Sequence, residues 1–221
     1  MPYEAGWAYV TTTAGARAAL TAGSNVRFVS DITVAKGDTQ TNGSGVTGLY
    51  VKNGQTLDGN GKALSVNVGG TWDSALAING GLVKNLTITK GFRGVFITKG
   101  TEKVVLENVV VNGPTYTISC DSAGKQGLEA YNSKFYGWTS YAKTVGDVYF
   151  EGCTFGKGAG YNFSRPYAPT TYVNCTFEAG HAIDARAGVT FENCTFNGVA
   201  LTSENINTLV TGNRQNIVSV K

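Results

Sequence analysis

The chain has 221 residues, of which 15 % are charged and 42 % hydrophobic, and its formal net charge is +3. This length is enough for one sizeable core, and no shift in composition marks a second domain. The small, scattered charge argues against nucleic acid as a partner, because phosphate binding needs clustered Lys and Arg. No apolar run is long enough to span a bilayer, and the start lacks a Sec-type signal pattern. We therefore expect no membrane partner, and synthesis in the cytoplasm without Sec export.

Near the N-terminus, an alanine-rich run lies between a capping residue and a glycine. Thr13 precedes the run and Gly23 follows it, and these residue types are typical of helix ends. The pattern predicts a short helix, with residues 18–20 covering an end of the core that would otherwise be exposed. We interpret residues 1–24 as an N-terminal segment with this capping helix.

After an alternating, strand-like stretch at 26–34, the chain repeats a short phrase every 19 to 24 residues. A period near 20 residues indicates a solenoid in which each repeat forms one turn. The clearest copies read YFEGCTF at 149–155, TYVNCTF at 171–177 and TFENCTF at 190–196. Weaker copies stand at 82–88, 105–111 and 129–135. A degenerate first copy at 62–66 is centred on Ala63.

The central residue of each regular copy is asparagine or glycine. Apolar residues stand two positions before this centre and one and three positions after it, which breaks the alternation of a single strand. The centre must therefore bend the chain, and Asn and Gly adopt the left-handed conformation at the lowest cost. Each turn should contain two strands joined by this bend, with a third strand between copies. The predicted bends are at residues 85, 108, 132, 152, 174 and 193.

These Asn-Cys-Thr-Phe phrases and the asparagine ladder resemble the right-handed parallel β-helix proteins of the pectate-lyase-like superfamily. The resemblance covers roughly residues 25–198 and implies an all-β, single-domain, right-handed parallel β-helix, with residues 199–221 as the last rung and C-terminal cap. The resemblance says little about function, because such helices serve as lyases, glycosidases, phage tail spikes, adhesins and inert rods.

Three of the four cysteines, Cys153, Cys175 and Cys194, occupy the same inward position on successive copies. A stack of small core residues explains this spacing, and we expect free thiols rather than disulfides. The inward neighbours are phenylalanines, which cannot ligate a metal. We predict no metal and no cofactor.

Two sets of charged residues are candidates for catalysis. Glu107, Glu151 and Glu192 share the position before the bend, with Tyr131 and Val173 in the intervening copies, which would separate the carboxylates by about 10 Å. That separation is near the upper end of the range for inverting glycosidases. A glutamate beside a solvent-facing bend is also an ordinary surface residue.

The second set is Glu178, His181, Asp184 and Arg186. A β-elimination needs a base and a cation that holds the substrate carboxylate, and these residues could supply both. Asp184 and Arg186 could equally form a surface ion pair. The calcium-carboxylate, paired-aspartate and Gly-His-Gly motifs of the enzymes in the superfamily are missing.

Aromatic residues are concentrated in the central copies. Such side chains can stack on sugar rings, anchor a protein partner or simply fill loop packing. The candidate binding residues are Trp138, Tyr141, Tyr149, Tyr161, Arg165 and Tyr167.

We therefore expect a non-enzymatic structural or adhesive module, most similar to a phage virion component such as a capsid decoration, head-fibre or tail-spike protein. Its partner would be virion proteins or a cell-surface polysaccharide, and it would be located on the virion surface. That it forms a homotrimer is a further hypothesis. The alternative is a polysaccharide lyase or glycosidase that acts on an outward face of the β-helix.

Overall fold

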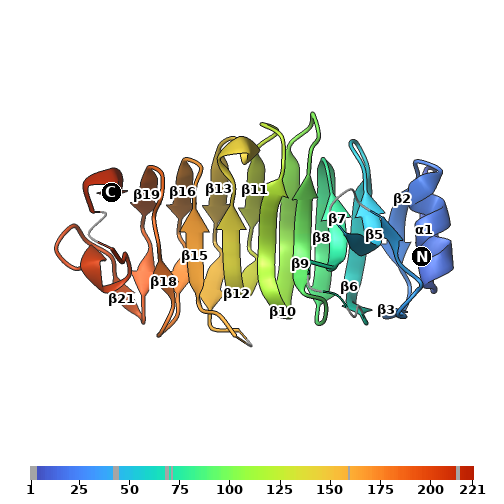
Figure 1. The fold of residues 1–221 in the computed structure, drawn as a ribbon, viewed down its shortest axis with the longest axis horizontal. Coiled ribbons are helices and arrows are strands. Elements are labelled where there is room, and N and C mark those ends of the chain that lie inside the picture. Colours follow the sequence, from blue (N-terminus) through green and yellow to red (C-terminus); the bar gives the residue numbers. More distant parts are fainter. Residues whose placement is uncertain (1–3, 42–44, 68–69, 71, 159, 213–214) are drawn as a thin grey trace.

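The structure is a computed structural model that describes residues 4–41, 45–67, 70, 72–158, 160–212 and 215–221. It is an all-β solenoid of about six turns, with 54 % strand and 8 % helix. The turns are stacked into an elongated rod with the N-terminal helix at one end and the C-terminus at the other (Figure 1). None of the helices in the described part is long and apolar enough to span a membrane. The predicted N- and C-terminal segments include residues 1–3 and 213–214, which lie outside the described residues.

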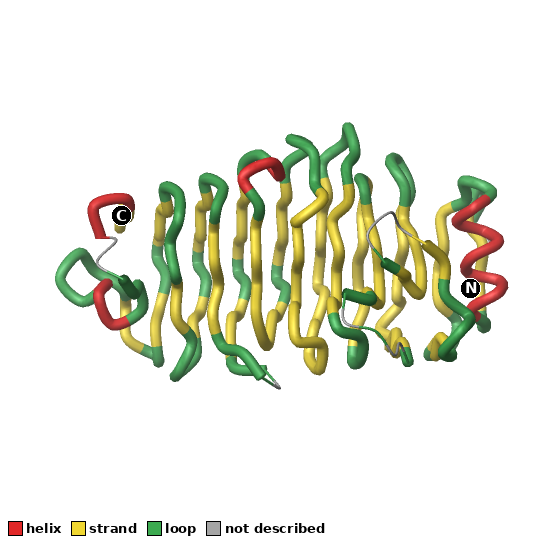
Figure 2. The backbone as a smooth tube through the Cα atoms, in the orientation of Figure 1, coloured by secondary structure: helices red, strands yellow, loops and turns green. Residues whose placement is uncertain are grey.

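Three parallel sheets form the walls of the rod, and we number them in the order in which the chain meets them in each turn. Figure 2 shows the strands of successive turns side by side, with most of the loops at the edges. The first sheet runs through β1 (Trp7–Val10), β2 (Asn25–Phe28), β6 (Thr56–Val66), β8 (Gly81–Ile88), β10 (Val104–Ser122), β11 (Leu128–Tyr131), β13 (Val148–Glu151), β16 (Thr170–Val173), β19 (Val189–Glu192) and β22 (Val218–Val220).

The second sheet shares the long strands β6, β8 and β10 with the first, because these strands continue through the bend. Its other strands are β3 (Ile32–Val34), β12 (Lys134–Tyr141), β14 (Thr154–Gly156), β17 (Thr176–Phe177) and β20 (Thr195–Phe196), which ends in an antiparallel hairpin with β21 (Val199–Ala200).

The third sheet forms between the repeated phrases, as predicted from the sequence. It contains β5 (Val46–Val51), β7 (Ser74–Ile78), β9 (Arg93–Thr98), the ends of β10 and β12, β15 (Phe163–Pro166) and β18 (Ala182–Ile183), with β4 (Gln40–Thr41) antiparallel to β5. The described residues also form three short 3-10 helices: η1 (Lys143–Val145), η2 (Ile206–Thr208) and η3 (Gln215–Ile217).

The bends between the first and second sheets confirm the prediction for the repeats. The five asparagines at 85, 108, 132, 174 and 193 have φ between 50° and 52°, and Gly152 has φ 63°. Side chains also join successive bends: Asn108 Nδ2 donates to Asn85 Oδ1 at 3.0 Å. At Gly152 a Cβ atom would lie 2.6 Å from Asn132 Oδ1, the end of the side chain in the preceding bend.

The centre predicted for the first copy, Ala63, is wrong. The left-handed residues are Asn60 and Gly61, with φ 51° and 75°. The register against β8 shifts between Asp58 and Lys62, so this turn contains extra residues and bends upstream of Ala63.

The helix α1 (Thr13–Thr21) lies across the N-terminal end of the rod (Figure 1). Its cap is Thr12, one residue before the predicted Thr13, and the Thr12 hydroxyl accepts a hydrogen bond from the Gly15 N–H. The buried residues are Thr13, Ala16 and Leu20, whereas the predicted Ala18 is exposed. Spacings of three and four residues place this set on one side of a helix, which the consecutive residues 18–20 cannot do.

Aromatic side chains fill the C-terminal half of the core in columns along the rod. Tyr172 stacks on Phe150 at 5.3 Å and on Phe191 at 5.2 Å, with interplanar angles of 12° and 11°. In the next column Phe155 stacks on Phe177 at 5.1 Å. All four cysteines are buried free thiols. The thiols of three of them each donate to the carbonyl of an inward residue one turn earlier, a contact that suits a small residue after each bend.

Candidate functional site

Aromatic rings form a continuous series on the outer side of the third sheet, and we call this surface the aromatic face. It consists of Trp72, Phe92, Tyr116, Trp138, Tyr161 and Phe163, with Tyr167 nearby at the C-terminal end of β15. Centroid separations along the series are 5.7 Å from Trp72 to Phe92, 5.5 Å from Phe92 to Tyr116 and 4.3 Å from Tyr116 to Trp138. Trp138 then lies 5.1 Å from Tyr161.

The strand register explains why the rings align. Arg93, Tyr116 and Trp138 are direct partners in neighbouring parallel strands, so their side chains leave the sheet on the same side. The core cluster includes Val95 and Ile118, which are two residues further along the same strands, but it includes none of the six rings. The rings of the aromatic face therefore lie outside the core, in addition to the aromatic columns within it.

The rings at the two ends of the aromatic face are the most exposed. Trp72 is 47 % exposed, Tyr161 43 % and Tyr167 37 %, whereas Tyr116 in the middle is only 9 % exposed because its neighbours cover it. Exposed aromatic rings of this kind offer flat apolar surface at a low cost in conformational entropy.

A charged group borders the C-terminal half of the aromatic face. The Arg165 guanidinium lies 5.3 Å from the Trp138 ring centre and 5.0 Å from that of Phe163. Asp184 accepts hydrogen bonds from Arg165 Nε at 2.8 Å and from Arg186 Nε and Nη2 at 2.8 Å each. Burial acts to raise the pKa of Asp184, but the hydrogen bonds from Arg186 and Arg165 outweigh it and hold this pKa below its usual value.

A second arginine lies under the N-terminal half. Arg93 is 4 % exposed, and its guanidinium carbon is 4.1 Å from the Phe96 ring centre and 5.2 Å from that of Trp72. Its Nε and Nη1 have no hydrogen-bond partner among the described residues. Burial lowers the pKa of Arg93, and Asp121 and Asp73 partly oppose this effect. Arg93 is therefore a buried cation whose charged form Asp121 and Asp73 favour.

Four of the six predicted binding residues, Trp138, Tyr161, Arg165 and Tyr167, lie on or beside the aromatic face. Tyr149 lies elsewhere, on the outer side of the first sheet, where its hydroxyl donates to Glu151 Oε2 at 3.0 Å. The prediction for Tyr141 is wrong, because this side chain is fully buried and shares a 3.2 Å hydrogen bond with the Tyr172 hydroxyl. Tyr141 stands at even spacings from Phe135 and Thr139 in β12, which are also fully buried, so strand alternation directs it into the core.

The four candidate catalytic residues do not converge. His181 is 2 % exposed and faces the core, where its Nε2 and the Ser164 hydroxyl are 3.0 Å apart. Asp184 and Arg186 form the ion pair on the outer surface that was the simpler interpretation of their spacing. Glu178 lies beside Tyr136 in another part of the turn, where it helps to raise the pKa of that phenol, although burial is the larger cause. The sheet wall thus separates His181 from Asp184.

The predicted glutamate column has the expected register. Glu107 pairs with Tyr131, Tyr131 with Glu151, Glu151 with Val173, and Val173 with Glu192. The carboxylates are therefore two strands apart, about 10 Å. Glu151 accepts the hydrogen bond from Tyr149, and the column is on the first sheet, away from the aromatic face. Within the described chain, no cluster of His, Cys, Asp and Glu is placed to hold a metal.

The predicted binding residues include only Trp138 and Tyr161 of the six rings of the aromatic face. Trp72, Phe92, Tyr116 and Arg93 belong to segments between the weaker repeats, whose lengths differ from turn to turn. Aligning these segments on the third strand of each turn places Arg93, Tyr116 and Trp138 in one column. That alignment is the signal that could have identified them.

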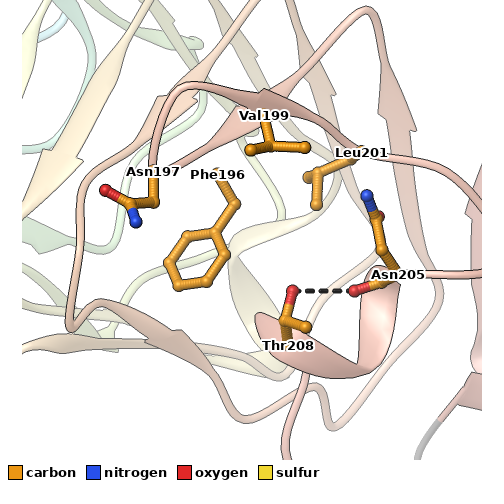
Figure 3. Close-up of a pocket in the computed structure, with 6 residues that line it drawn as sticks. All are labelled: Phe196, Asn197, Val199, Leu201, Asn205 and Thr208. Carbon is orange, nitrogen blue, oxygen red and sulfur yellow. Dashed lines mark hydrogen bonds between the residues drawn. The ribbon is translucent and has the colours of Figure 1, made fainter.

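A separate apolar pocket of about 220 Å³ lies at the C-terminal end of the rod (Figure 3). Phe196, Val199 and Leu201 supply apolar walls, and the Thr208 hydroxyl donates to the Asn205 carbonyl at 2.7 Å. The residues that line it include no acid or base, so they offer no group for proton transfer. It lies beside the antiparallel pair of β20 and β21 at the end of the second sheet.

Comparison of the chain with protein-family models, with curated proteins and with solved structures finds no match. The function therefore has to be inferred from the geometry of the aromatic face and from the chemistry of its side chains.

Proposed function

We propose that this protein is a non-enzymatic structural or adhesive module that binds carbohydrate through its aromatic face. The observation that carries the proposal is the continuous series of rings outside a core that is already filled. Trp72 and Tyr161 keep nearly half of their surface exposed at the two ends of this series. Core packing does not account for rings left open to solvent in this way.

Carbohydrate fits this surface better than a protein partner does, because polar groups accompany the rings. A sugar ring has apolar C–H faces that stack on aromatic side chains and hydroxyls that need both donors and acceptors. Arg165 and Asp184 supply both beside Trp138, and their mutual ion pair holds them in place. Binding sites for small polar molecules commonly combine apolar lining with a few placed polar groups of this kind.

The resemblance to β-helix spikes and decoration proteins suggests the setting that we propose, which is a phage virion component whose aromatic face contacts a cell-surface polysaccharide. Nothing in the arrangement of the described side chains favours the lyase or glycosidase alternative, since Glu178, His181 and Asp184 lie in different places. A homotrimer belongs to the same proposal.

Affinity electrophoresis in gels that contain soluble polysaccharides tests the proposal. We expect at least one polysaccharide to retard the protein, and the double variant Trp72→Ala/Tyr161→Ala to lose about tenfold or more in affinity, about 1.4 kcal/mol. Tyr149→Ala is the matched control, because it removes a half-buried tyrosine from the first sheet. Loss of binding in Tyr149→Ala alone, or no retardation in any gel, would contradict the proposal.

A further inference from the structure

We infer that the ligand of the aromatic face is an uncharged glycan chain that lies along the rod and spans several turns. This inference rests on the proposed function and specifies the class of carbohydrate. Two independent features support it: the distance between the exposed rings and the balance of charges around them.

The spacing of the rings indicates a chain rather than a single sugar. Trp72 precedes β7 and Tyr161 precedes β15, and between these strands lie β9, β10 and β12 in the third sheet. Centroid separations of 6.4 Å from Trp72 to Tyr116, 4.3 Å from Tyr116 to Trp138 and 5.1 Å from Trp138 to Tyr161 place the two end rings at most about 16 Å apart. The rings between them are half-buried or buried, so the best stacking surfaces are at the two ends. One sugar can cover only one end, whereas an extended chain can cover both.

The described charged groups that interact beside and beneath the aromatic face balance one another. They are three arginines, Arg93, Arg165 and Arg186, and three carboxylates, Asp73, Asp121 and Asp184. An acidic glycan would place its carboxylates or sulfates against these aspartates, and a cationic one would meet the arginines. Hydroxyl groups donate to a carboxylate and accept from a guanidinium, so an uncharged sugar can use both without an uncompensated charge.

Arg165 is the polar residue best placed to contact such a chain. Asp184 binds only its Nε, and its other N–H groups have no hydrogen bond to a described residue. The side chain is 30 % exposed and lies against Trp138 and Phe163, so these donors face the space over the rings. Arg186 holds Asp184 from the other side through two hydrogen bonds and thus positions Arg165 indirectly.

Isothermal titration tests the inference with two sets of probes at low and high salt. The uncharged set comprises gluco-, xylo- and manno-oligosaccharides from the monosaccharide to the octasaccharide, and the acidic set comprises polygalacturonate and alginate. We expect an uncharged series to gain at least tenfold in affinity from disaccharide to hexasaccharide, with little change on adding salt.

Variants at the two ends separate the inference from the proposed function. Trp72→Ala and Tyr161→Ala should each lower the affinity for the hexasaccharide. In at least one of the two variants, the affinity for the disaccharide should stay within about twofold of the native value. Tyr149→Ala should change neither. Uncharged sugars that bind equally at every length, or acidic chains that bind in a salt-sensitive manner, would overturn this inference and leave the proposed function standing. Absence of binding to every probe and to every polysaccharide gel would contradict the proposed function itself.

Discussion

Lowering the pH from 7 to 5 should destabilise the fold through a single side chain, His181. It is the only histidine in the chain. The ring is 2 % exposed and packs against Phe155 and Phe177, each with a centroid separation of 5.9 Å. Burial lowers the pKa of His181 from 6.5 to about 4, an effect that the Gly156 backbone only partly opposes.

The direction and size of the effect follow from this shift. The fold favours the neutral ring, so the stabilisation is complete above pH 6.5 and is lost as the pH falls toward 4, because the unfolded chain binds a proton that the native chain does not. The difference between 6.5 and about 4 corresponds to about 3 kcal/mol in total. About 2 kcal/mol of this should be lost by pH 5.

Urea unfolding at pH 7, 6 and 5 measures the loss directly. The pKa values of Asp184 and Glu129 are lowered, so these paired carboxylates remain ionised over this interval. His181→Gln is the control, because it removes the titrating ring. We expect it to be less stable at pH 7 and nearly independent of pH from 7 to 5. A native protein whose unfolding free energy stays constant over this interval would refute the reasoning, as would a His181→Gln variant with the native slope.

Three further substitutions test the fold. Asn174→Ala should lower the free energy of unfolding by about 1–2 kcal/mol in urea titrations, because alanine tolerates φ 52° poorly. Asn174→Gly should lower it by less, and equal losses would contradict this explanation of the bends. Gly100→Ala should lower the melting temperature, since a Cβ there would overlap the Asn79 carbonyl oxygen, and Gly188→Ala, which faces open space, should not. Phe150→Ala should lower the free energy of unfolding by about 3–5 kcal/mol, because it leaves a cavity between stacked rings. A decrease below 1 kcal/mol would argue against the aromatic column.

The solenoid could be predicted because its most constrained positions recur. A left-handed bend admits few residue types, so Asn and Gly mark it in one turn after another, and the inward Phe and Cys positions follow at fixed offsets. The first turn escaped this logic because its extra residues between Asp58 and Lys62 displaced the bend. The helix cap was misplaced by one residue because Thr12 and Thr13 are chemically equivalent in the sequence.

The aromatic face was only partly predictable, for a physical reason. Its residues lie in the third strand of each turn or in the loop before that strand, and these loops vary in length, so the sequence carries no fixed offset from the bend. The same uncertainty assigned Tyr141 to the surface, although strand alternation from the buried Phe135 in β12 directs it inward. His181 was likewise expected near Asp184, and strand alternation places the two on opposite sides of the wall.

The central claim is that the aromatic face is the surface that binds carbohydrate, and tryptophan fluorescence tests it most directly. The chain has three tryptophans, and Trp7 lies on the first sheet, where the Arg27 guanidinium is 4.5 Å from its ring centre. Trp7→Phe leaves only Trp72 and Trp138 to emit. A saturable change in the emission of this variant during titration with a polysaccharide that retards it in gels is the predicted result. Retardation with no change in emission would place the binding surface elsewhere and contradict the claim.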